Sequence, residues 1–149
     1  MSSPSWPPSY AFEPVHVGRG ELHGLLSQAD RLIVDAQVVG VSGPSRHILA
    51  HNAVVLLAKL ALAAHGWRTI ESHHYWSIDS LKHTVGLTDD EVDVLQAHRS
   101  KRHEASYSSA PTVSDTEVAE FVDRVVALRA RVVAWLDTEH AELWSSPAE

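Results

Sequence analysis

The amino-acid sequence predicts an all-α protein, an antiparallel bundle of four long helices and one short helix. Three observations support this fold class. Apolar residues recur at helical spacing in several segments, glycine and capping residues separate those segments, and no alternating strand pattern of useful length occurs. Short connections between long helices favour antiparallel neighbours, so we expect the helices to enclose one core.

The first two predicted helices occupy the first half of the chain. One begins near Glu21, where apolar side chains start to recur every three or four residues, and ends before Gly40 and Gly43. The next runs from Pro44 to just before Gly66, because proline suits a first helical turn and glycine suits the position after the last one. Apolar residues occupy nearly every side of this second helix, so we expect it at the centre of the bundle.

Three further helices are predicted after a linker. Residues 67–76 lack any period and are interpreted as the linker, and a short helix then begins at Ser77 and ends at Gly86. The capping boxes TDDE at residues 88–91 and SDTE at residues 114–117 start the last two helices. The final helix, predicted to reach about Glu142, carries an apolar seam in steps of three and four: Val118, Phe121, Val125, Leu128, Val132 and Trp135.

A length of 149 residues suits a single domain, which we place at residues 20–144. Residues 1–19 are rich in proline and are predicted to form a flexible arm, while residues 145–149 are predicted to form a frayed tail. The opening lacks a basic start and an apolar run, and no stretch of about eighteen apolar residues occurs. These features predict a cytoplasmic protein without a membrane segment.

Composition excludes several kinds of site. The absence of cysteine rules out disulfides, thiolate metal ligands and cysteine nucleophiles. A formal net charge of -7 leaves no large basic surface for long nucleic acid, so any RNA contact has to be local. Eleven histidines are many for this length, and their protonation is expected to change the net charge near pH 6.

The segment LQAHRSKRHEASYS, residues 95–108, is polar where a helix is expected. Val92 and Leu95 mark the core side of that helix, and Lys101 points elsewhere. The core side continues with polar residues only: Arg99, Arg102, His103, Ser106 and Tyr107. Two interpretations stay open. Either the bundle ends near Leu95 and the rest is solvated, or the polar groups lie at an interface, where a desolvated arginine needs a partner.

Five segments together resemble the HEPN superfamily of small helical-bundle domains, over about Glu21 to Leu143. They are LLSQADRLIVDA, LAHNAVVLLAKLALAAHGWRT, HHYWSIDSL, RSKRHEASY and VSDTEVAEFVDRVVALRARVVAWL. RSKRHEASY is similar to the place where such domains carry an arginine, then a polar residue and, roughly four to six residues later, a histidine. The resemblance implies a helical bundle, usually a homodimer, in which these residues of both subunits meet at a shared cleft.

The resemblance also implies roles for single residues. Arg102 matches the arginine, His103 matches the polar position, and Tyr107 stands where a histidine is expected. In active members the cleft cleaves RNA without a metal, which requires a base near neutrality and a cation on the phosphate. Tyrosine, with a pKa near 10, is a poor base at pH 7. Arg99 and Ser106 are further candidates for the cleft.

Three functions follow from these residues. The leading hypothesis is a dimeric binding or regulatory module with an RNA or nucleotide ligand. The alternative is a metal-independent endoribonuclease of toxin–antitoxin or defence type that uses Arg102 and His103, aided by Tyr107. The third is a purely structural interaction protein. Because some members of the superfamily pair with a nucleotidyltransferase, such a protein is a candidate partner.

Polar residues also interrupt the apolar second helix. His51 and Asn52 are interpreted either as a hydrogen-bonded core pair or as residues that orient Arg102 or line the same cleft. Lys59 lies two turns further along, and its long aliphatic stem can carry its charge to the surface.

Two adjacent histidines raise the question of a metal. His73 and His74 could supply imidazole ligands to zinc together with His51 or His103. Adjacent histidines in a loop rarely face one ion, and no acidic or thiolate partner is close in sequence. The prediction is therefore a protein without a metal or other cofactor.

Overall fold

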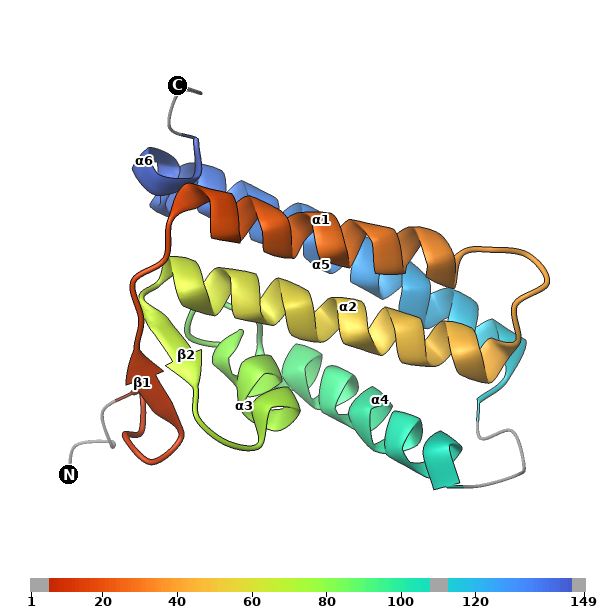
Figure 1. Ribbon diagram of the computed structural model, residues 1–149. Coiled ribbons are helices and arrows are strands. Elements are labelled where there is room, and N and C mark those ends of the chain that lie inside the picture. Colours follow the sequence, from red (N-terminus) through yellow and green to blue (C-terminus); the bar gives the residue numbers. More distant parts are fainter. Residues whose placement is uncertain (1–5, 108–112, 146–149) are drawn as a thin grey trace.

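The computed structural model describes residues 6–107 and 113–145. For residues 102–107 it describes the backbone only. The described chain is mostly helical, as the predicted all-α class requires, and also holds a small two-stranded sheet (Figure 1). The elements are β1 (Phe12–Pro14), α1 (Arg19–Ala36), α2 (Gly43–Ala64), β2 (Trp67–Thr69), α3 (His73–Ser80), α4 (Asp89–Tyr107), α5 (Asp115–Glu139) and α6 (Ala141–Trp144).

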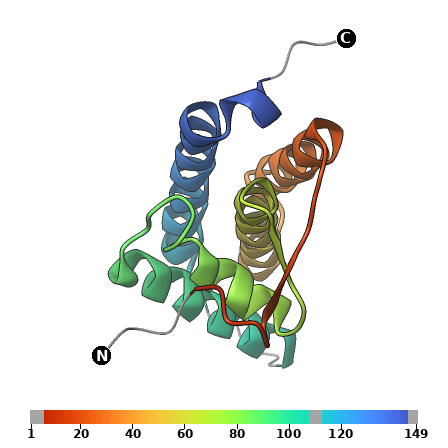
Figure 2. The same ribbon diagram turned by 90° about the vertical axis from the view of Figure 1, so that its left-hand side faces the viewer.

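Helix α2 lies at the centre of the molecule, as predicted. It packs against α1, α3, α4 and α5, and Figure 2 shows α3 and α4 along one side of the group formed by α1, α2 and α5. By length and composition alone α2 is apolar enough to cross a membrane, but 67% of the apolar window is buried inside the protein. Contact with helices on several sides accounts for its apolar composition.

The predicted helix starts are borne out at α4 and α5. At α4, Thr88 and Glu91 bond each other's backbone N–H groups at 3.0 and 3.1 Å, which closes the capping box from both sides. At α5, the Ser114 hydroxyl accepts from the Glu117 N–H at 3.1 Å. The Glu117 carboxylate is ion-paired with Lys101 of α4, so the start of α5 is tied to its neighbour.

The apolar seam of the last helix forms part of the core. Five of its six predicted members are buried, and Trp135 is half-buried against them. The helix ends at Glu139, earlier than predicted, and the chain continues into the short helix α6. Trp144 of α6 is buried and stacks on His23 of α1, with ring centroids 3.9 Å apart.

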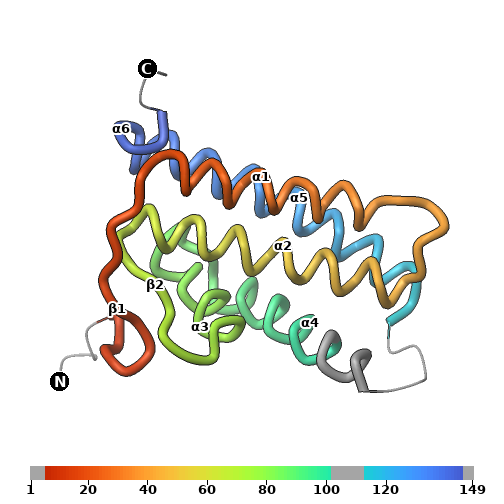
Figure 3. The backbone as a smooth tube through the Cα atoms, in the orientation of Figure 1, coloured from red at the N-terminus to blue at the C-terminus, as the bar shows by residue number. Residues whose placement is uncertain are grey.

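The predicted flexible arm is wrong for residues 6–18, which fold onto the bundle. β1 pairs antiparallel with β2, placing Phe12 opposite Thr69, at the end of the bundle where α2 finishes (Figure 3). Phe12 is only 2% exposed and packs with Trp6, Trp67 and other side chains in a second small core. A three-residue strand leaves no periodic pattern, and its partner lies more than fifty residues away in the chain.

The predicted linker is also wrong, because residues 67–76 contain β2 and the first half of α3. The short helix starts at His73, four residues before the predicted Ser77, which is buried inside it. Ser72 precedes the helix in a left-handed conformation, with φ 45°. With only eight residues, α3 makes about two turns, too few for a recognisable period.

Candidate functional site: a polar cavity between α4 and α5

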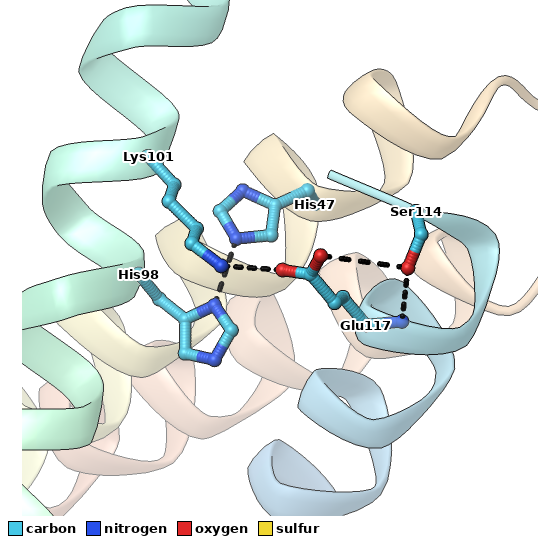
Figure 4. A network of polar contacts seen from close by, with 5 residues as sticks. All are labelled: His47, His98, Lys101, Ser114 and Glu117. Carbon is cyan, nitrogen blue, oxygen red and sulfur yellow. Dashed lines mark hydrogen bonds and ion pairs between the residues drawn. The ribbon is translucent and has the colours of Figure 1, made fainter. Parts of the chain in front are cut away.

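The polar half of α4 stays packed on the bundle for at least one further turn. Val92 and Leu95 are buried, and His98, one turn on, is half-buried. The His98 Nδ1 atom lies 3.0 Å from Nε2 of His47 on α2 (Figure 4). The interpretation that packing ends near Leu95 is therefore wrong as far as Lys101, the last residue of α4 with a described side chain.

An aromatic ring supports this histidine pair. Phe121 of α5, itself 1% exposed, stacks on His98 with ring centroids 3.9 Å apart and an interplanar angle of 7°. The His47 ring lies 4.9 Å from the same phenyl ring. Three helices thus fix both imidazoles, which removes most of their rotational freedom.

Burial determines which nitrogens of the pair carry protons. The Nδ1 atom of His47 is buried and has no hydrogen-bond partner in the described part of the chain. A buried N–H without a partner is rarer in proteins than an unpaired acceptor, so the favoured tautomer has the His47 proton on Nε2, where it donates to His98. The neutral His98 ring then carries its own proton on Nε2, the nitrogen that does not face His47.

Both imidazoles are neutral at neutral pH. Burial, together with the nearby His47, Lys101 and Arg124 side chains, lowers the pKa of His98 to about 4. Burial also lowers the pKa of His47, helped by Lys101 and opposed by Glu117. A neutral His98 offers one hydrogen-bond donor without a charge of its own.

An ion pair borders the histidines. Lys101 of α4 binds the Glu117 carboxylate of α5, whose other contact is the Ser114 hydroxyl at 3.5 Å (Figure 4). The hydrogen bond from Lys101 lowers the pKa of Glu117. Helical spacing predicted that Lys101 points away from the core side of α4. In the structure it points toward α5, a neighbour that the spacing along one helix cannot reveal.

These side chains line an open cavity of about 230 Å³ between α4 and α5. Its walls are formed by Val94, His98, Lys101, Glu117, Glu120, Phe121 and Arg124. Arg124 is exposed and, unlike Lys101, has no ion-pair partner within the described ranges. The lining of the cavity therefore includes a guanidinium, a neutral imidazole and an aromatic ring.

The structure does not describe most of the residues that the HEPN resemblance singles out. Arg102, His103, Ser106 and Tyr107 belong to α4, but their side chains lie outside the described residues.

Arg99, also predicted for the cleft, is described and faces another helix. Its Nε donates to Gln96 at 2.8 Å, and its guanidinium lies 5.7 Å from the ring centre of Tyr75. Arg99 is therefore directed toward α3 and does not line the cavity with His98.

His51 and Asn52, which were predicted to act together, differ in burial in the structure. His51 is fully buried, and its Nε2 lies 2.8 Å from Nδ1 of His74 on α3. Asn52 is half-buried on the neighbouring side of α2. His73, the other half of the histidine pair in the sequence, contacts the Thr69 hydroxyl at 2.5 Å.

No group of three or more metal-ligating side chains occurs among residues 6–101 and 113–145. His73 and His74 have different partners, Thr69 and His51.

Sequence reasoning missed His47, His98 and Arg124. One signal was available: His47 and His51 are four residues apart in an apolar helix, so both lie on one side of it. The partners of this face, His98 and His74, come from helices whose positions the sequence alone does not determine.

No family model, curated protein or solved structure matches this chain. The resemblance to the HEPN superfamily therefore rests on the five sequence segments.

Proposed function

We propose that this protein is a HEPN-like antiparallel helical bundle that acts as a dimeric binding module for a nucleotide. The ligand's phosphate would bind in the cavity between α4 and α5. One observation carries the proposal: His98, which His47 and the Phe121 ring hold in place, and the exposed Arg124 line one cavity together with Phe121.

The chemistry of these groups suits a phosphate. A guanidinium donates two parallel hydrogen bonds to phosphate oxygens, and charge-assisted bonds of this kind are the stronger ones. The His98 N–H adds a neutral donor, and Lys101 can exchange part of its contact with Glu117 for the ligand. Glu117 and Glu120 line the same cavity, so a ligand with many negative charges is disfavoured.

Size and net charge favour a nucleotide over a long RNA. Small-molecule sites usually enclose about 300–1,000 Å³, so a cavity of about 230 Å³ holds a phosphate group and leaves the base and sugar partly outside. The formal net charge of -7 opposes a long polyanion, whose binding depends on many cationic contacts.

A second copy of the chain would complete the site. Arg102 follows Lys101 directly in α4, and the HEPN resemblance implies that this arginine meets its counterpart across a dimer. The base and sugar of the nucleotide, which extend out of the cavity, would then lie between the two copies. A nucleotidyltransferase partner and a toxin–antitoxin setting are supported by the resemblance alone.

The test is calorimetric titration of the purified protein with AMP, with adenosine and inorganic phosphate as part-ligands. We expect AMP to bind and Arg124→Gln to weaken its binding about tenfold or more, because a hydrogen bond to a charged group contributes about 1.5–3 kcal/mol. Arg31→Gln serves as the matched control, since Arg31 is exposed on α1, away from the cavity.

Three outcomes distinguish the hypotheses. AMP binding that is lost in Arg124→Gln and kept in Arg31→Gln supports the nucleotide module. Binding of a short RNA without binding of AMP would show that the ligand is RNA and not a nucleotide. If a folded dimer, with twice the chain mass of 16.4 kDa, binds neither ligand, the remaining hypothesis is a structural interaction protein.

A further inference from the structure

A second cavity lies at the opposite end of α2 and contains Lys59. The last twelve residues of α2, Ala53 to Ala64, include one charged side chain, that of Lys59. Lys59 is half-buried, and no residue in the described ranges forms an ion pair or a hydrogen bond with its ammonium group. A partly desolvated cation without a partner is costly, so its position requires an explanation.

The cavity that Lys59 lines encloses about 310 Å³, at the lower end of the range for small-molecule sites. Most of its wall is apolar, formed by Val15, Val17, Leu25, Leu62, Ala63 and Trp67. Figure 2 shows the segment that connects β1 to α1 running beside α2. The Val15 N–H donates to the Gly66 carbonyl at 2.9 Å, which holds this wall in place.

The other polar groups of the cavity are mostly engaged. Arg68 is ion-paired with Glu13 at 2.6 Å, and His73 contacts Thr69. Glu21 lines the cavity from the first turn of α1, is exposed, and forms no ion pair with Lys59. Lys59 is thus the cation left to bind a ligand, and Glu21 would repel a second negative charge.

We propose that this cavity binds a small amphiphilic monoanion, a medium-chain carboxylate whose head group pairs with Lys59 while its aliphatic chain lies against the apolar wall. Pairing supplies the partner that the half-buried ammonium lacks. Burial of the chain adds about 25 cal/mol for each Å² removed from water. The site is separate from the α4–α5 cavity, and the two share no lining residue.

Calorimetric titration with sodium octanoate tests the proposal on the full chain. We expect octanoate to bind, Lys59→Met to weaken its binding at least tenfold, and Lys59→Arg to retain it. Methionine keeps the stem length and helix propensity of lysine and removes only the charge. Circular dichroism and the melting temperature show whether each variant is folded.

The controls separate this site from the proposed nucleotide site. Lys101→Met, in the other cavity, should leave octanoate binding unchanged, and Lys59→Met should leave AMP binding unchanged. Octanol, which has the same chain length and no carboxylate, tests whether binding depends on the negative charge of the ligand. The proposal is overturned by equal binding of octanol and octanoate, by undiminished octanoate binding in folded Lys59→Met, or by no octanoate binding to the wild-type protein.

Discussion

At the residue scale, the unusual feature is a pair of buried imidazoles in a mostly apolar helix. His47 and His51 of α2 are both fully buried, and each contacts a histidine on a neighbouring helix. A neutral imidazole pair satisfies one donor and one acceptor at once, so it can be buried at modest cost. Protonation would place two N–H groups against each other and break the bond.

The lowered pKa values predict loss of stability in acid. Because the pKa of His98 is lower in the folded protein, the unfolded chain binds the proton first as the pH falls. Stability should therefore decrease from about pH 6.5 toward pH 4, by up to about 1.4 kcal/mol per pH unit for one such group. Urea unfolding of the wild-type protein and of His98→Gln at pH 7 and pH 5 measures this.

His98→Gln should lose less stability than the wild type over that interval, since glutamine does not titrate. His16→Gln is the matched control because His16 is exposed. An equal loss in the wild type and in His98→Gln would show that the histidine pair is not responsible.

At the scale of elements, a short ribbon joins the N-terminal segment of the described chain to the connection between α2 and α3. β1 and β2 pair over three residues each, which is too short to be stable alone. Phe12 is inserted between Trp76 and Trp6, with ring centroids 5.7 and 5.5 Å away. The ribbon is therefore held by aromatic packing more than by its backbone bonds.

Truncation of this aromatic side chain should destabilise the whole bundle. Phe12→Ala is expected to lower the free energy of unfolding by about 3 kcal/mol, the usual cost of removing a buried phenyl ring. Tyr10→Ala provides the control in the same segment, because Tyr10 is 66% exposed and should change stability by less than about 0.5 kcal/mol. Similar unfolding curves for both variants, recorded in urea, would mean that residues 6–14 are not part of the cooperative fold.

At the scale of the whole molecule, electrostatics argue against an RNA-cleaving enzyme. A general base for RNA cleavage works best with a pKa near the operating pH. His98, the half-buried histidine of the α4–α5 cavity, has its pKa lowered to about 4, and Tyr107 stands where the proposed HEPN resemblance would place a histidine. The formal net charge of -7 further weakens attraction for a long RNA.

We therefore expect the purified protein to leave RNA intact in the presence of EDTA. Arg102→Ala, prepared in the same way, distinguishes a contaminating nuclease from the protein itself. Cleavage that survives chelation and disappears in Arg102→Ala would establish the endoribonuclease alternative and make His103 the next residue to substitute.

The sequence by itself determined the features that depend on neighbours along the chain. The starts of α4 and α5 follow from capping residues within three positions of each other. The length of α2 and its central place follow from its proline, its glycine and its apolar composition. Such signals act over one or two turns, so they can be recognised without knowing the fold.

Only the tertiary structure decided which distant residues meet. His47 and His98 are 51 residues apart in the chain, and the ion-paired residues Arg68 and Glu13 are 55 residues apart. β1 exists as a strand because β2 lies beside it. Such contacts depend on how helices and strands pack and cross, which is set by side chains throughout the core. For that reason the sequence could place Lys101 and Lys59 on helices, but it could not show that each lines a cavity.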